Sequence, residues 1–162
     1  MNSGAEAVAI RRMTAADLAQ TQAIAARLAE APHWQPSAYL SAIDPDAAPR
    51  RIALVAADRQ SGSILAVAVA SILLPEAELE TIAVAPECQR RGIGRQILTA
   101  LMDELKAAGV HELLLEVRSS NLAAIALYHA LGFVPCGLRP SYYLDPVEDA
   151  VLMRLPLTEK SA

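Results

Sequence analysis

The sequence predicts one α+β domain, built on a mixed, mostly antiparallel sheet of six to seven strands with about four helices. The 162 residues are 54% apolar and 20% charged, which is enough for one sizeable core and argues against a disordered chain. Because the expected helices are separated from runs of consecutive β-branched strands, an α+β arrangement is favoured. We expect the domain to occupy residues 1–162, with its core at about 7–156 and a loose tail at 159–162.

The first half of the chain predicts a strand, two helices and three further strands. Thr14, followed three residues later by Asp17, is typical of a helix N-terminus, and Pro32 and Pro36 separate the two helices. A polar loop at 58–63 lies between two β-branched runs, which predicts a hairpin. The expected elements are a strand at 7–13, helices at 15–31 and 37–43, and strands at 51–57, 64–74 and 79–84.

The second half predicts two helices that each end at a glycine. The segment 92–108 carries an apolar stripe before Gly109, and the segment 121–131 ends at Gly132. The stripe consists of Ile93, Ile97, Leu98, Leu101, Met102 and Leu105. The remaining strands are expected at 112–117, 133–143 and 150–156.

Composition and charge argue against several classes of function. The net charge of −4 and a pI near 5.3 disfavour nucleic acid as a direct partner. Cys88 and Cys136 lack the spacing of metal ligands, so we expect free thiols in a reducing compartment and no metal. No targeting segment is expected, and the longest apolar run, 64–74, is too short to span a bilayer. We therefore expect a cytoplasmic protein without a membrane partner, either a monomer or a weak dimer.

Residues 89–95 have the character of an anion site. They follow the strand expected at 79–84 and open the long amphipathic helix, so free backbone N–H groups and the positive helix end point to one place. Gly92 and Gly94 let the backbone approach a ligand closely, and three arginines add positive charge to an otherwise acidic protein. The pattern predicts a cradle for an anion, in the first place a phosphate.

Two blocks of the sequence together resemble the GNAT superfamily of acyl-CoA-dependent N-acetyltransferases. The pyrophosphate motif of that superfamily, Gln/Arg-x-x-Gly-x-Gly/Ala, stands here as Gln89-Arg90-Arg91-Gly92-Ile93-Gly94, and a second block runs from Asn121 through Tyr128 to Phe133. Within the superfamily the C-terminal half most resembles the ribosomal-protein-alanine N-acetyltransferases, the RimI group. The resemblance implies a GNAT fold with splayed central strands, and an enzyme that uses acetyl-CoA as cosubstrate.

The resemblance also implies which residues bind acetyl-CoA. The strand before the motif is expected to carry the pantetheine arm on its backbone and to polarise the thioester carbonyl. Asn121 is expected both to cap its helix and to contact the pantetheine. The expected binding residues are Ile82, Ala83, Val84, Gln89, Arg90, Arg91, Gly92, Ile93, Gly94, Arg95, Asn121 and Tyr128.

Glu116 is the candidate general base that removes a proton from the acceptor amine. It lies within an apolar strand, where loss of water makes a carboxylate a better proton acceptor. The alternative is a structural carboxylate paired with a nearby arginine such as Arg118. Glu80 is a second candidate base, because GNAT enzymes often use a carboxylate on the strand before the glycine motif.

Tyr128 is the candidate general acid that returns a proton to the sulfur of CoA. A phenol suits this role because it is protonated at neutral pH and can donate when a thiolate forms. The alternative is an ordinary helix tyrosine that packs on Phe133.

The acceptor that the resemblance implies is the N-terminal peptide of a ribosomal protein, most of all the N-terminal alanine of a small-subunit protein. Candidate acceptor-binding residues are Trp34, Glu80, Tyr142 and Tyr143, although a packing role suits the aromatic ones equally well. Acidic residues near these positions suit the Ala-Arg start of the RimI substrate. The alternatives are a broader N-terminal or small-amine acetyltransferase and a non-catalytic acyl-CoA-binding module.

Overall fold

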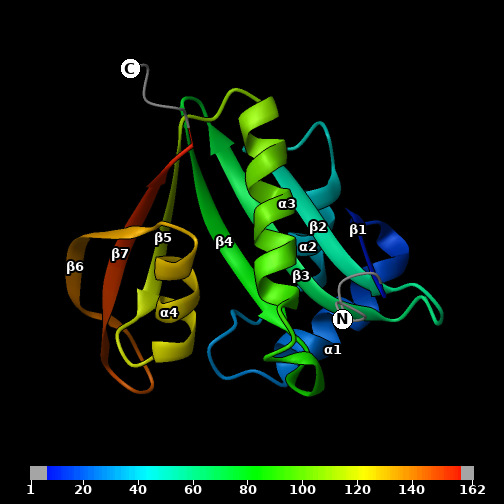
Figure 1. The fold of residues 1–162 in the computed structure, drawn as a ribbon, viewed down its shortest axis with the longest axis horizontal. Helices are drawn as coiled ribbons and strands as arrows, with labels where there is room; N and C mark the ends of the chain where they lie inside the picture. Colours follow the sequence, from blue (N-terminus) through cyan, green and yellow to red (C-terminus); the bar gives the residue numbers. More distant parts are fainter. Residues whose placement is uncertain (1–6, 158–162) are drawn as a thin grey trace.

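The computed structural model describes residues 7–157, which form one seven-stranded sheet with helices on both faces (Figure 1). The strands are β1 (Val8–Arg12), β2 (Arg50–Asp58), β3 (Ile64–Leu73), β4 (Glu76–Val84), β5 (Glu112–Arg118), β6 (Val134–Tyr143) and β7 (Glu148–Pro156). The helices are α1 (Leu18–Ala26), α2 (Pro36–Ile43), α3 (Ile93–Ala107) and α4 (Leu122–Ala130), with short 3-10 turns η1 (Ala15–Asp17) and η2 (Pro86–Cys88). The strand order is β1-β2-β3-β4-β5-β7-β6, and only β4 and β5 pair in parallel. The predicted α+β class is confirmed.

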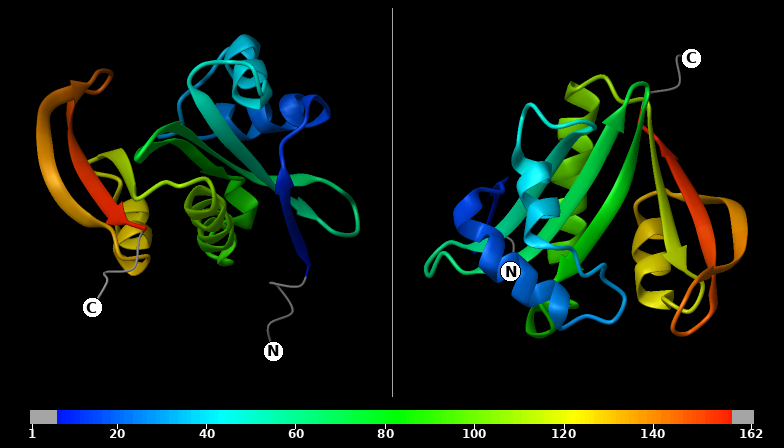
Figure 2. Two further views of the ribbon diagram at one scale, coloured as in Figure 1. Left: turned by 90° about the horizontal axis from the view of Figure 1, so that it is seen from above. Right: turned by 180° about the vertical axis from the view of Figure 1, so that it is seen from behind.

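Two helices cover each face of the sheet. Figures 1 and 2 place α3 and α4 on one face and α1 and α2 on the other. The apolar stripe of α3 packs on β2, β3 and β4, and five of its residues are buried. A buried leucine or isoleucine side chain stabilises a fold by roughly 1.5–3 kcal/mol, so this stripe anchors α3 and the loop that precedes it.

The two central strands separate after a short stretch of pairing. β4 has nine residues, but only Glu76–Glu78 pair with β5, at 112–114. The register between β3 and β4 shifts where Val69 faces Thr81 and Ala70 faces Leu79, which leaves Glu80 as the extra residue of a bulge. Beyond this point the β5-facing edge of β4 has no partner strand within residues 7–157 (Figure 1). The predicted splay of the central strands is confirmed.

Some predicted boundaries are wrong. The helix predicted at 15–31 begins as the turn η1 and ends at Ala26, five residues before the position that Pro32 restricts directly. Arg27, just past the helix, instead forms a 2.7 Å ion pair with Glu87 of η2. The strand predicted at 79–84 begins at Glu76, and the last strand begins at Glu148 rather than at residue 150. The tail predicted at 159–162 lies outside the described residues.

Candidate active site

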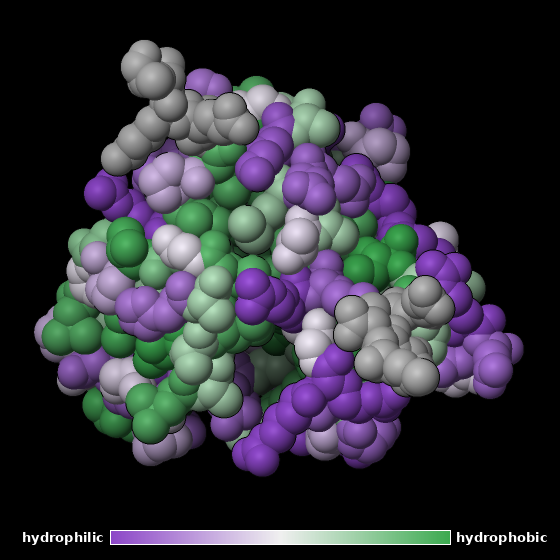
Figure 3. All heavy atoms as spheres, in the orientation of Figure 1, coloured by the Kyte–Doolittle hydropathy of each residue, from purple (hydrophilic) through white to green (hydrophobic). Residues whose placement is uncertain are grey.

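A cavity of about 1300 Å³ lies where β4 and β5 separate. Its mouth is visible as a hollow near the lower edge of Figure 3, between an apolar and a hydrophilic side. Parts of β4, β5, β6, α4, the α3 N-terminus and the loop after α1 line it. The cavity brings together every predicted site residue except Arg91, which is not part of the lining.

One end of the cavity is formed by the turn directly before α3. Gly92 has a φ of 78°, a left-handed conformation that glycine adopts at little cost, and Arg90 also has a positive φ of 63°. The helix begins at Ile93, and its first hydrogen bond runs from the Gln96 N–H to the Gly92 carbonyl, at 3.1 Å. The N–H groups of the first turn therefore precede the intrahelical ladder and can donate to an anion.

Two further contacts shape this end. The side-chain amide of Gln89 donates to the Val84 carbonyl at 3.2 Å, so it ties the turn to the end of β4. A Cβ added to Gly94 would lie 3.4 Å from Leu127 and 3.6 Å from Val84, which shows how closely α3, α4 and β4 approach there. Arg90 and Arg95 line the cavity beside the turn and provide positive charge.

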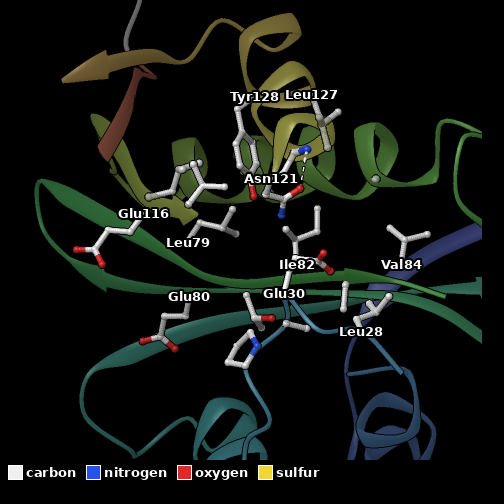
Figure 4. A pocket seen from close by; sticks show the side chains of 18 of the residues that line it. Leu28, Glu30, Leu79, Glu80, Ile82, Val84, Glu116, Asn121, Leu127 and Tyr128 are labelled. Atoms are coloured by element: carbon white, nitrogen blue, oxygen red, sulfur yellow. Dashed lines mark hydrogen bonds between the residues drawn. The ribbon is translucent and has the colours of Figure 1, made fainter. Parts of the chain in front are cut away.

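The middle of the cavity is formed by α4 and β4. Asn121 caps α4 by accepting a 3.2 Å hydrogen bond from the Ala124 N–H, and its amide nitrogen points into the cavity (Figure 4). Ile82 and Val84 face it from β4 (Figure 4). The predicted N-cap is confirmed, and one side of the Asn121 amide remains directed at the cavity.

Tyr128 is 5% exposed, yet its hydroxyl points into the cavity (Figure 4). The ring packs on Phe133 with centroids 5.5 Å apart, so the packing role and the cavity position both hold. Burial, with a smaller effect of Tyr143, raises the pKa of Tyr128 well above the ordinary value for a phenol. The hydroxyl therefore retains its proton at neutral pH, as a general acid requires.

Glu116 lies at the other end of the cavity, just past the β5 residues that pair with β4 (Figure 4). Its side chain is 19% exposed and forms a 3.0 Å ion pair with Arg139 of β6. The alternative of a carboxylate paired with an arginine is therefore met by Arg139 and not by Arg118. Arg118 turns toward the β6–β7 hairpin, where it meets Glu148 at 3.4 Å and stacks over the Tyr143 ring at 4.4 Å.

Two more carboxylates approach Glu116 from β4. Glu80, the bulge residue, forms a 2.9 Å ion pair with Arg51 of β2. Glu78 has no hydrogen bond or ion pair among the described residues. Desolvation, reinforced by Glu116 and Glu80, raises the pKa of Glu78 above the ordinary value for a carboxyl group. This end of the cavity therefore carries an excess of negative charge.

Aromatic side chains complete the same end. Trp34 lines the cavity and packs on the buried ring of Tyr39 with centroids 5.2 Å apart. Tyr142 and Tyr143 meet edge to face at 5.1 Å, next to a register shift that interrupts the pairing of β6 with β7. A hydrogen bond donated to Glu116 raises the pKa of Tyr142. The four candidate acceptor residues thus lie around one opening.

Sequence reasoning missed several cavity residues. Arg51, which lines the cavity, and Arg139, which contacts Glu116 without lining the cavity, were given no role, because each becomes important only through strand pairing or a bulge. Glu78 was considered only as one of the acidic residues near the expected acceptor. A charged residue at the edge of an apolar strand was the available signal for Arg51 and Arg139. Leu28 and Leu127 also line the cavity, but in the sequence they show only the apolar spacing of a helix, which does not indicate a site.

Residues 15–133 match the acetyltransferase (GNAT) family. The chain belongs to the GNAT family. This GNAT acetyltransferase is 50% identical over 101 residues to the [ribosomal protein bS18]-alanine N-acetyltransferase of Escherichia coli K12, covering 61% of this chain and 68% of that protein. The crystal structure of the ribosomal-protein-S18-alanine N-acetyltransferase from E. coli matches with a TM-score of 0.82 and 38% identity, over 95% of this chain and 96% of that one. Naa20 of Chaetomium thermophilum, solved with a bisubstrate analogue, matches with a TM-score of 0.79 and 27% identity, over 91% and 86%.

Membership of the GNAT family establishes the reaction class and the cosubstrate, which is acetyl-CoA. The cavity fits acetyl-CoA, because a helix start with free N–H groups faces it at one end and an unpaired strand edge runs along it. Within residues 7–157, no group of His, Cys, Asp and Glu side chains is arranged to hold a metal ion. None of the helices in that range is long and apolar enough to cross a membrane.

Proposed function

We propose that this GNAT acetyltransferase transfers the acetyl group of acetyl-CoA to the N-terminal alanine of ribosomal protein bS18. The observation that carries the proposal is the likeness to the E. coli enzyme named for this reaction, which extends over 95% of this chain at 38% identity. The cavity adds support, because its reactive groups lie at the end where carboxylates and aromatic rings surround the opening.

The shape of the cavity supports one orientation of acetyl-CoA. The pyrophosphate binds at the N–H groups of Ile93 to Arg95, where the helix dipole is positive. The pantetheine extends along the unpaired edge of β4, at 82–84, and contacts the Asn121 amide. This places the thioester between Tyr128 and Glu116, because the opposite end of the cavity is taken by the pyrophosphate.

The proposed chemistry assigns one proton transfer to each of two residues. A free α-amine has a pKa of roughly 7.7–8.0 and is largely protonated at neutral pH, so Glu116 accepts the proton that the ammonium must lose. The amine nitrogen then attacks the thioester carbon, the carbon–sulfur bond breaks, and Tyr128 donates its proton to the departing sulfur. The second proton, which the nitrogen loses on becoming an amide, passes to solvent, from which the Tyr128 phenol is restored. Glu80 remains the second candidate base, and it is paired with Arg51 as Glu116 is paired with Arg139.

The decisive experiment supplies acetyl-CoA with a peptide that carries the N-terminal sequence of bS18. We expect release of free CoA and an acetyl group located on the α-amine by mass spectrometry. The controls are the same peptide with a blocked N-terminus and a panel of unrelated peptides and polyamines. Turnover of the polyamines in preference to the peptide would replace the proposed acceptor, and binding of CoA without any turnover would favour a non-catalytic protein.

A further inference from the structure

Arg139 reaches Glu116 from two strands away. On β7, Leu152 pairs with Glu116 and also with Gly137 of β6, and Ala150 pairs with Arg139. The Arg139 side chain therefore crosses over β7 before its guanidinium meets the Glu116 carboxylate at 3.0 Å. The same guanidinium lies 5.5 Å from the centre of the Tyr142 ring.

The surroundings of Glu116 are mostly negative or neutral. The carboxylates around it are Glu78 and Glu80 of β4 and Glu148 of β7. The neutral groups are Tyr128 of α4 and Tyr142 and Tyr143 of β6. The cations are Arg139 of β6, Arg51 of β2 and Arg118 of β5 itself. Arg51 and Arg118 are already engaged by Glu80 and Glu148. Arg139 is thus the cation in direct contact with Glu116, while Glu78 close by has no ion pair of its own among the described residues.

We propose that Arg139 is a positioning residue for acetyl transfer, whose guanidinium holds the Glu116 carboxylate in place at the opening of the cavity. This inference rests on the proposed role of Glu116 as general base. Without the guanidinium, Glu116 would face Glu78 and Glu80 with no adjacent cation, and like charges favour uptake of a proton. A protonated Glu116 cannot accept the proton of the substrate, so we expect loss of Arg139 to raise the pH below which activity falls.

The chain offers a matched control for this proposal. Arg154 of β7 lies 3.9 Å from Glu112 of β5, and its side chain is 52% exposed, against 53% for Arg139. This second pair lies on the same sheet but does not line the cavity. Arg139→Gln removes the charge, Arg139→Lys keeps it, and Arg154→Gln removes an equally exposed charge away from the site.

The test is the pH dependence of kcat/KM for each variant with the bS18 peptide. We expect Arg139→Gln to move the acidic limb to higher pH by roughly one unit, the low end of what an adjacent opposite charge contributes. Arg139→Lys and Arg154→Gln keep the acidic limb of the unmodified enzyme. A profile of Arg139→Gln that overlays that of the unmodified enzyme, or an equal displacement in Arg154→Gln, would overturn the proposal.

A second readout needs no acceptor. The titration midpoint of the Glu116 side chain, followed by its carboxyl carbon resonance, moves upward in Arg139→Gln and stays in place in Arg154→Gln. If the unmodified enzyme does not acetylate the bS18 peptide, the proposed acceptor fails, while this titration still decides the role of Arg139. An unchanged midpoint in Arg139→Gln rejects the role even in an enzyme that acetylates bS18.

Discussion

Tyr128 combines deep burial with a hydroxyl that faces the cavity (Figure 4). Burial raises its pKa, so the group stays protonated throughout the range in which an α-amine begins to lose its proton. The proton is therefore available for a leaving thiolate at every working pH. We accordingly expect no basic limb of the pH profile to arise from Tyr128 below its ordinary pKa of about 10.

Replacing Tyr128 by Phe removes the hydroxyl and keeps the ring contact with Phe133. We expect kcat to fall by roughly 100-fold or more, the usual contribution of general acid catalysis, and the dissociation constant of acetyl-CoA to change little. Steady-state kinetics and calorimetric titration measure the two effects. Tyr39→Phe, at another buried tyrosine that lies outside the cavity lining, is the control for loss of a hydroxyl. An unchanged kcat would remove Tyr128 from the mechanism.

At the scale of single elements, the turn before α3 depends on one backbone conformation. Gly92 has a φ of 78°, and a Cβ at this position would meet no atom within 4 Å, so alanine there is opposed by backbone strain and not by a clash. Strain in the left-handed region costs roughly 1–2 kcal/mol, which corresponds to about a tenfold weaker affinity if it is relieved by moving the loop. We expect Gly92→Ala to weaken acetyl-CoA binding by about this factor in calorimetric titration.

Gly94 provides the comparison for Gly92. It has no positive φ, and an added methyl group would make near-ordinary contacts with Leu127 and Val84. We expect Gly94→Ala to affect acetyl-CoA affinity less than Gly92→Ala does. The reverse order would mean that space between α3 and α4, and not the conformation of the turn, limits cosubstrate binding.

The junction between β1 and η1 is held by Asp17, a buried carboxylate. It accepts two hydrogen bonds from the Arg11 guanidinium, at 2.7 and 2.9 Å, and one from the Thr14 N–H at 2.8 Å. These contacts, with Arg11 the larger contributor, lower the pKa of Asp17 from 3.8 to about 2. The shift corresponds to about 2 kcal/mol of stability at neutral pH.

Asp17→Asn tests this junction. Because the pKa is lowered in the folded state, the stabilisation is complete above pH 3.8 and is lost as the pH falls toward about 2. We expect the variant to unfold about 2 kcal/mol more easily at neutral pH and to converge with the unmodified protein in acid, as measured by urea unfolding. Asp103→Asn, on the exposed face of α3, is the control. A difference that is independent of pH would contradict the assignment.

The elements that could be predicted are those specified by their own residues. The apolar stripe and the terminal Gly109 predict α3 to within one residue of each end, and Asn121 predicts the start of α4. A bulge in the strand before the glycine motif follows from the family resemblance, but its position at Glu80 could not be predicted, nor could the end of α1 or the start of β4, because contacts with other segments determine them. The ion-pair partner of Glu116 could not be predicted for the same reason, since only the β6–β7 pairing brings Arg139 near it.

At the scale of the whole molecule, the sheet consists of two parts that share little direct pairing. β1 to β4 form one part and β5 to β7 the other, and only three residue pairs of β4 and β5 join them (Figure 2). The cavity is lined from both parts, with the α3 turn on the first and Asn121 and Tyr128 on the second. A ligand that contacts both parts therefore adds a connection that strand pairing does not supply.

Hydrogen exchange with two ligands tests this connection. Acetyl-CoA, which extends along the whole cavity, is expected to slow amide exchange both in the α3 turn and in α4 and β5, because binding stabilises every region that must open to release it. ADP carries a pyrophosphate but no pantetheine, so at saturation it is expected to protect the α3 turn and leave α4 unchanged. Equal protection of α4 by ADP would mean that the two parts already move as one body, and that acetyl-CoA does not join them.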